Sequence, residues 1–221
     1  MSGFDLGPSY RVRVITVEEA LALQERLRAR VELSGPTAFE LVAGLDVQYA
    51  GDDLTAAVVV FDGRGERVDQ ASVRGRTEFP YVPGLFAFRE VPALTAALEA
   101  LSVTPDLLVC DGYGLAHPRR FGLACHLGVE TGLPALGVGK THFVGAYTEP
   151  GPERGAHAPI TLDGHVVGRV LRTRPGVKPV FVSPGHRIDL DTACAQVLRL
   201  TPRYRLPEPI RAADHLARHG A

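Results

Sequence analysis

The chain of 221 residues has no tryptophan, one methionine, three cysteines, only two lysines among its 24 basic residues, and no long hydrophobic run. Its longest apolar stretch, Ala56–Phe61, is far shorter than the roughly 20 residues that span a bilayer. The N-terminal 14 residues contain no apolar segment of the kind found in signal peptides. We therefore expect no membrane partner and a cytoplasmic location.

The cysteines are also placed in a way that excludes two classes of protein. Cys110, Cys125 and Cys194 are odd in number, lie in apolar stretches and show no C-x-x-C spacing. This pattern predicts buried, reduced thiols, and it argues against a disulfide scaffold and against a zinc site built on paired cysteines. The formal net charge of −1 excludes a uniformly basic surface, so a nucleic acid would have to bind a local basic patch.

What is present is the composition of an ordinary folded protein, with 45% hydrophobic and 22% charged residues. Thr16 and Glu19 form a capping-box pattern, which predicts a helix that runs to about Val31. Three extended runs separated by turn residues follow, at 39–49, 55–61 and 67–76. Beyond them we expect helices at 89–101, 121–131 and 189–200, and strands at 106–110, 134–138, 160–172 and 177–183.

This order of elements predicts a single α/β domain over residues 1–221. The central sheet is expected to be mixed, with an antiparallel three-strand start and flanking helices. The Gly-, Pro- and Glu-rich segment 145–158 is predicted to be a surface loop. The Pro- and Arg-rich tail from about Pro202 is predicted to be irregular.

Two aspartates stand where predicted strands would carry them. Asp46 interrupts the hydrophobic run 41–49, and a buried unpaired carboxylate needs a metal, an arginine partner or a face open to solvent. Asp111 follows strand 106–110, at the end of a strand where open α/β sheets bind ligands. Gly112 lets the backbone turn sharply or approach a ligand closely. A structural aspartate and an ordinary polar loop are the alternatives.

An aromatic loop precedes the second predicted helix. Tyr81 stands between Pro80 and Pro83, and Arg89 and Glu90 follow at the expected helix start, where a carboxylate is favoured by the helix dipole. Exposed aromatic loops insert between bases or stack on them in some nucleic-acid enzymes. The alternative is that Tyr81 covers the core.

A lysine follows the strand predicted at 134–138, in the run Gly139-Lys140-Thr141. The run resembles the end of a phosphate-binding P-loop, but that motif requires glycine where this chain has Pro134. Proline has a fixed φ and no N–H, so it cannot form the phosphate-binding nest. The P-loop is therefore rejected, and Lys140 is expected at a strand end near Asp111.

Together these positions predict a metal site. Asp46, Glu90 and Asp111 would converge on one edge of the sheet, with His117 and Lys140 beside them. Several carboxylates in one place repel one another unless a divalent cation holds them. Mg²⁺ is the natural occupant, because it takes oxygen ligands and leaves positions open for phosphate and water.

Five runs in this order carry a resemblance to a known family: GLDVQY, YVPGLFAFRE, DGYGLAHPR, GVGKTHFVG and SPGHRIDLDTA. From about Ala43 to Arg211 the chain resembles endonuclease V, a deoxyinosine-specific repair nuclease. The resemblance implies a ribonuclease H-like fold and hydrolysis of the second phosphodiester bond 3′ to a deaminated base, with Mg²⁺ as cofactor and Mn²⁺ able to substitute. It also implies a DNA partner that carries deaminated bases, and we expect a monomer.

The resemblance assigns roles to the matching residues. Asp46 and Asp111 would be metal ligands supported by Glu90. Asp214 is a further candidate for the metal site, at a position that is an acid in some relatives and histidine in others. His117 and Lys140 would orient the attacking water or stabilise charge on the phosphate. Tyr81 would be a strand-separating wedge. The residues expected at the DNA are Tyr81, Pro83, Gly84, Arg89, Gly112 and Arg119.

An extruded hypoxanthine base is expected in a pocket of main-chain groups near Gly84 and Gly112. Two other functions stay open at this point. One is an inosine-specific ribonuclease that uses the same metal site, since recognition of the 2′-hydroxyl leaves no motif in the sequence. The other is a non-catalytic protein that binds damaged DNA.

Overall fold

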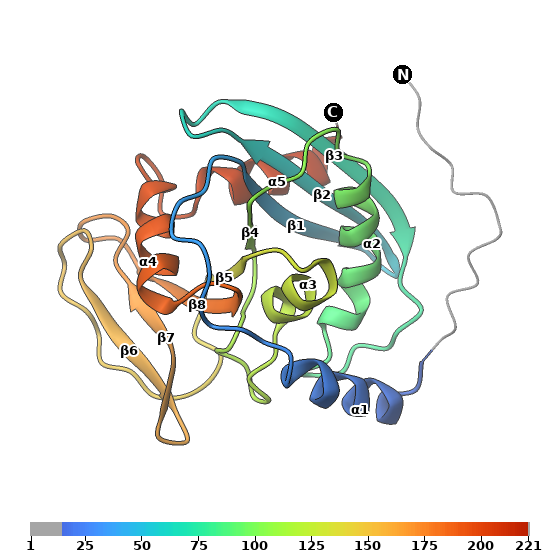
Figure 1. The fold of residues 1–221 in the computed structure, drawn as a ribbon, viewed down its shortest axis with the longest axis horizontal. Helices are drawn as coiled ribbons and strands as arrows, with labels where there is room; N and C mark the ends of the chain where they lie inside the picture. Colours follow the sequence, from blue (N-terminus) through green and yellow to red (C-terminus); the bar gives the residue numbers. More distant parts are fainter. Residues whose placement is uncertain (1–14, 221) are drawn as a thin grey trace.

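A computed structural model of the protein describes residues 15–220; the N-terminal stretch in which we expect no signal peptide lies outside them. Its centre is an eight-stranded mixed sheet with the strand order β3-β2-β1-β4-β5-β8-β7-β6 (Figure 1). The predicted α/β class is confirmed. No helix within residues 15–220 is both long and apolar enough to cross a membrane.

The antiparallel start of the sheet is the expected meander. β1 (Val42–Ala50), β2 (Asp53–Phe61) and β3 (Arg67–Arg76) pair in sequence order. A tight turn at Gly51, where φ is +70°, connects β1 to β2. The side chains of β3 are exposed or half-buried, as expected of a strand at the edge of a sheet.

The middle of the sheet is parallel and buried. β4 (Leu107–Cys110) pairs with β1, and β5 (Ala135–Gly139) pairs with β4, both in parallel. The side chains of both short strands are fully buried, which explains why the sequence shows them as continuous apolar runs rather than as alternating patterns.

An antiparallel group completes the sheet on the other side of β5, and here one prediction is wrong. The run 160–172 is not one strand but part of a hairpin, β6 (His157–Leu162) and β7 (His165–Leu171), which precedes β8 (Val180–His186). Asp163 and Gly164 form its two-residue turn with φ of +50° and +76°. An Asp-Gly pair in this conformation is a strong hairpin signal that the hydrophobic pattern hides.

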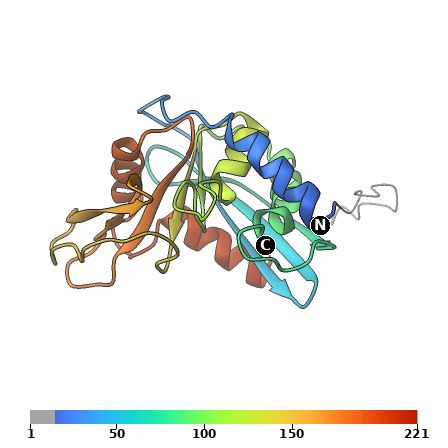
Figure 2. The ribbon, with the colours of Figure 1, turned by 90° about the horizontal axis from the view of Figure 1, so that it is seen from below.

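Helices cover both faces of the sheet (Figures 1 and 2). α2 (Ala87–Glu99) and α3 (Leu123–Thr131) pack on one face, and α1 (Val17–Arg28) lies against α3. α4 (Leu190–Arg199) packs on the opposite face. The capping box at the start of α1 is present, and the three cysteines are buried and unpaired, as predicted.

The prediction of an irregular tail is wrong. Residues Glu208–His219 form α5, which packs across β1 and β2 on the same face as α4. Its buried residues recur at helical spacing: Pro209, Ile210, Ala213, Leu216 and Ala217. Pro209 stands in the first turn, where the helix needs no amide donor, so the proline does not oppose the helix.

Candidate active site

The parallel pairing of β1 and β4 brings two acids together. Leu45 of β1 is in register with Cys110 of β4, and the backbone N–H of Asp111 donates to the carbonyl of Leu45 at 3.1 Å. Asp46, in the middle of β1, therefore lies beside Asp111, which directly follows β4. Lys140, the residue after β5, forms an ion pair with Asp111.

A third acid comes from a neighbouring helix. Glu90 lies in the first turn of α2 with 6% of its surface exposed, and Asp46 is 7% exposed. Burial raises the pKa of Asp46 to about 7, and the nearby charge of Asp111 adds to the effect. Burial, together with the charges of Asp46 and Asp111, raises the pKa of Glu90 to about 8. The charges of the neighbouring carboxylates thus add to burial in disfavouring the ionisation of Asp46 and Glu90.

Gln48, a residue that the sequence analysis missed, links a fourth acid, Asp214, to this group. The Nε2 atom of Gln48 donates to Asp46 at 2.8 Å and to Asp214 of α5 at 3.1 Å. Asp214 is also paired with Arg218 at 2.9 Å. A signal was available, because residues two apart on a strand share a face, so that Gln48 had to follow Asp46. The position of Asp214 depended on a helix that was not predicted.

The donor set fits a hard divalent cation. Carboxylate oxygens are the ligands that Mg²⁺ prefers. A cation would offset both the burial of charge and the repulsion between the acids, which together raise the pKa values of Asp46 and Glu90. Within residues 15–220, however, no three or more acidic, imidazole or thiol side chains are placed so that together they could hold a metal ion. Gln48 and Lys140 hold carboxylate oxygens that a metal ion would compete for.

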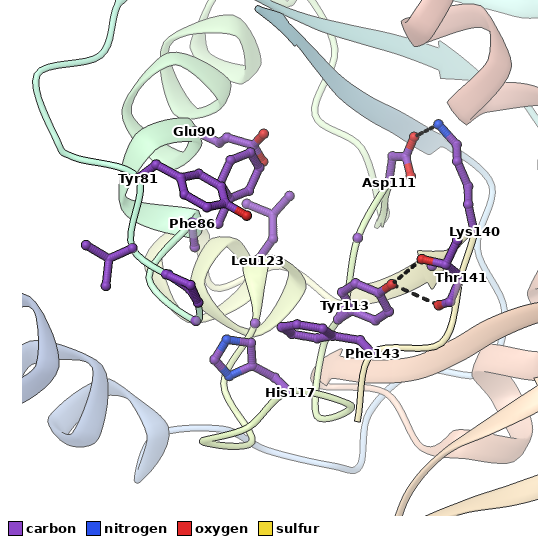
Figure 3. A pocket seen from close by; sticks show the side chains of 17 residues that line it. Tyr81, Phe86, Glu90, Asp111, Tyr113, His117, Leu123, Lys140, Thr141 and Phe143 are labelled. Atoms are coloured by element: carbon purple, nitrogen blue, oxygen red, sulfur yellow. Dashed lines mark hydrogen bonds and ion pairs between the residues drawn. The ribbon is translucent and has the colours of Figure 1, made fainter. Parts of the chain in front are cut away.

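An aromatic cavity of about 410 Å³ opens beside the carboxylates (Figure 3). Tyr81, 70% exposed, stands at its rim together with Pro83 and Gly84, and Gly112 lies in its wall. The ring of Tyr113 lies 4.9 Å from that of Phe143, between centroids. The Tyr113 hydroxyl donates to the Thr141 carbonyl at 2.9 Å, which fixes the ring. The cavity therefore offers planar rings and backbone groups to a flat ligand.

His117 lines this cavity, but Figure 3 shows it apart from the pair of Asp111 and Lys140. Its ring contacts Phe143, with 5.9 Å between centroids. Burial and the charge of Arg119 lower the pKa of His117 to about 4, so the imidazole is neutral at pH 7. A neutral ring beneath the aromatic loop can accept or donate a hydrogen bond, but it adds no positive charge.

Two arginines that the resemblance assigns to DNA make contacts within the protein. Arg119 donates to the Gly84 carbonyl at 2.5 Å and to Gln24 of α1, and Gln24 in turn donates to the same carbonyl at 3.0 Å. These bonds anchor the loop that carries Tyr81. Arg89 donates to the Phe79 carbonyl at 2.6 Å and lines a different cavity.

By contrast, Lys140 is well suited to act on an anion. Burial alone would lower its pKa, but the hydrogen bond and charge of Asp111 outweigh burial and raise it. The ammonium group thus stays positive at pH 7, next to the acids and at the wall of the aromatic cavity.

Comparison with known proteins gives a consistent result. A family model for endonuclease V matches residues 22–215. The chain is 59% identical over 208 residues to Endonuclease V of Nocardia farcinica, with 92% of each chain covered. The crystal structure of Endonuclease V from Streptomyces avermitilis is 55% identical, with a TM-score of 0.89 over 92% of both chains. Ciona intestinalis Endonuclease V, solved with a 24mer DNA containing an inosine followed by a ribo-adenosine, is 28% identical, with a TM-score of 0.79 over 91% of this chain and 96% of that one.

Proposed function

This chain belongs to the endonuclease V family, a family of metal-dependent nucleases, and we propose that it hydrolyses DNA at deoxyinosine. The bond cleaved is the second phosphodiester 3′ to the lesion, and the products carry a 3′-hydroxyl and a 5′-phosphate with the lesion retained. The observation that carries the proposal is the convergence of Asp46, Glu90 and Asp111 with Lys140 beside an aromatic cavity.

Asp46, Asp111 and Glu90 would hold Mg²⁺, with Asp214 close by through Gln48. When bound, the ion supplies positive charge to the phosphate oxygens and lowers the pKa of the attacking water. Mn²⁺ takes similar oxygen ligands and is expected to substitute.

The protein's own residues hold the phosphate and orient the acids. The Lys140 ammonium remains protonated and can stabilise the negative charge that develops on the phosphate during attack. Gln48 fixes the orientation of the Asp46 carboxylate by its 2.8 Å hydrogen bond. The hydrogen bond of Gln48 matters more here than in water because Asp46 is buried.

The aromatic cavity is proposed to receive the lesion base. Tyr113 and Phe143 offer ring faces on which a purine can stack, and the backbone at Gly84 and Gly112 can bond its polar edge. Neutral His117 would contribute to this base pocket by hydrogen bonding. Tyr81, at the exposed rim, would enter the helix and keep the strands apart.

A ribonuclease activity is the second candidate, and one observation favours testing it. The DNA bound to the Ciona protein contains a ribo-adenosine after the inosine, so a 2′-hydroxyl is accepted at that position in a relative. We therefore include an inosine-containing RNA among the substrates.

The test uses an end-labelled duplex with one deoxyinosine, with Mg²⁺ or with a chelator, beside the undamaged duplex and the inosine RNA. The proposal predicts a Mg²⁺-dependent nick in the damaged duplex, at the second bond 3′ to the lesion. The undamaged duplex should stay intact, and the RNA should be cleaved less than the damaged duplex or not at all. Cleavage of RNA only would assign the site to RNA processing. Binding without cleavage of any substrate would refute a nuclease.

Asp111→Asn tests the site assignment. The variant should lose cleavage while binding of the damaged duplex largely persists, because the carboxylate acts on the metal rather than on the base. The control is Asp53→Asn, which removes an exposed carboxylate from β2, a strand that is separated from β4 by β1. Cleavage by Asp111→Asn at the rate of the control would refute the assignment.

A further inference from the structure

A second cavity, lined by basic residues, lies on the other side of Lys140 from the aromatic cavity. It has a volume of about 440 Å³, and its walls include Lys140, Lys178, Arg172, Arg205 and Tyr147. Four of its lining side chains are cationic, against one carboxylate, that of Glu149. We infer that this cavity is a subsite for the substrate strand on the 3′ side of the cut and that Lys178 contacts a phosphate there. The inference rests on the proposed function and adds to it.

The two lysines of the chain both line this cavity. Arg205 fixes their backbones relative to each other: it donates to the carbonyl of Lys140 at 2.5 Å and to that of Lys178 at 2.9 Å. The guanidinium also donates to the Pro179 carbonyl at 2.8 Å. Arg205 thus holds the Lys178 side of the cavity at a fixed distance from Lys140, the lysine that pairs with Asp111.

Lys178 is the cation that is available to a ligand. Arg172 donates to backbone carbonyls and is paired with Glu149 at 2.8 Å, which neutralises the one carboxylate of the wall. Arg205 is committed to three carbonyls. The exposed ammonium of Lys178 makes no hydrogen bond or ion pair with any residue that the structure describes. A compact, exposed ammonium is suited to a phosphate as a point charge.

The remaining wall suits a nucleoside. The rings of His142, Tyr147 and Phe181 contact one another, with centroid distances of 5.0, 5.8 and 5.5 Å. The His142 ring is fixed by a 2.9 Å hydrogen bond with the Val144 carbonyl and is exposed. Aromatic surfaces beside cations bind single strands without sequence preference, since every base has a face on which to stack.

The position of the cavity gives the direction of the strand. It shares only Lys140 and Thr141 with the base pocket. His142 lines the basic cavity, whereas the next residue, Phe143, lines the base pocket, so the two spaces lie on opposite sides of this segment. The proposed cut lies 3′ to the lesion. A strand that leaves the base pocket and passes Lys140 therefore enters the basic cavity with its 3′ portion.

The experiment measures kcat and KM of the full chain with Mg²⁺ on single-stranded deoxyinosine oligonucleotides. Their 5′ portion is constant, and their 3′ portion either ends one nucleotide beyond the cut or extends several nucleotides further. For the wild type, KM should fall as the 3′ portion grows, because the added phosphates and bases reach the cavity.

Lys178→Ala should raise KM on the long substrates by about fivefold, as expected for the loss of one solvent-exposed ion pair. It should leave kcat unchanged on all substrates, and KM unchanged on the shortest one. The slope of log KM against log salt should fall by about 0.7 on the long substrates. Lys178→Arg should retain the wild-type behaviour. Arg174→Ala is the matched control, because it removes an exposed charge from the same segment without lining the cavity.

Failure of the inference can be told from failure of the proposed function. A wild type that cleaves none of the inosine substrates refutes the function. A wild type that cleaves them with a KM independent of the length of the 3′ portion refutes the subsite. Equal effects of Lys178→Ala and Arg174→Ala, or an equal effect of Lys178→Ala on all lengths, also refute it.

Discussion

Replacing Glu90 by glutamine should stabilise the protein in the absence of divalent cations. Glu90 has 6% of its surface exposed and lies near two other acids, and the pKa of its carboxyl is raised from 4.5 to about 8 by burial and by the charges of Asp46 and Asp111. Glutamine has nearly the same shape and keeps an oxygen for the Tyr49 hydroxyl, which lies 3.4 Å from Glu90. It carries no charge to be desolvated.

The direction in which stability changes with pH follows from proton binding. Between pH 4.5 and about 8 the folded protein keeps a proton on Glu90 that the unfolded chain releases, so stability is lost as the pH rises through this window. Each pH unit within it costs about 1.4 kcal/mol, which gives about 3 kcal/mol at pH 7 and about 5 kcal/mol at pH 8 as upper limits. Burying the polar amide of glutamine also costs free energy, which offsets part of this gain. We therefore expect a net stabilisation of about 2 kcal/mol at pH 8.

The assay is thermal or denaturant unfolding of the wild type and Glu90→Gln at several pH values between 5 and 8 in a chelating buffer. A gain of about 2 kcal/mol corresponds to a rise in Tm of about 4–8 °C for a chain of this size. Added Mg²⁺ should stabilise the wild type more than the variant, because the ion would relieve the same repulsion. Glu99→Gln, at the exposed end of the same helix, is the control and should leave Tm unchanged.

Two results would refute this reasoning. If Glu90→Gln were less stable than the wild type throughout the pH range, burial of the charge would not be the dominant effect. If the two proteins lost stability equally between pH 5 and 8, the proton that is bound on folding would belong to another group.

Three further substitutions test the loop, the core and the lysine. Tyr81→Ala should lower cleavage of duplex relative to single-stranded substrate by about tenfold with Tm unchanged, because the side chain is 70% exposed; equal losses on both substrates would contradict the wedge. Gly44→Ala should destabilise the fold by about 3 kcal/mol or more in denaturant unfolding, since its Cβ would lie 2.0 Å from the carbonyl carbon of Pro209, and an unchanged midpoint would show that α5 yields freely. Arg205→Met should lower kcat through the Lys140 backbone that it holds, and should have no further effect when combined with Lys140→Ala; an additive loss would mean that Arg205 acts independently.

Local patterns were sufficient for most of the framework. The capping box at Thr16 starts α1, the Asp189 side chain caps α4, and the buried strands β4 and β5 appear as short apolar runs. These features depend on neighbours in the sequence, so the sequence shows them directly. The turn at Asp163 and Gly164 was also a local signal, but the hydrophobic residues on either side of it concealed the hairpin.

The helix α5 was concealed by composition. Its segment is rich in proline and arginine. The helix becomes stable only when its apolar face around Ile210 packs against β1 and β2. Without that helix the place of Asp214 beside Gln48 could not be predicted.

The apolar runs of the sequence are enough to place Asp46 within one central strand and Asp111 directly after another. Because these strands are parallel neighbours with Leu45 in register with Cys110, the two aspartates lie side by side. The directions of the longer side chains, by contrast, depend on the folded chain. Arg119 bonds the loop of Tyr81 rather than facing outward, and Lys178 faces the same cavity as Lys140. The direction of a long charged side chain depends on carbonyls and carboxylates supplied by distant segments, and these come within reach only when the chain has folded.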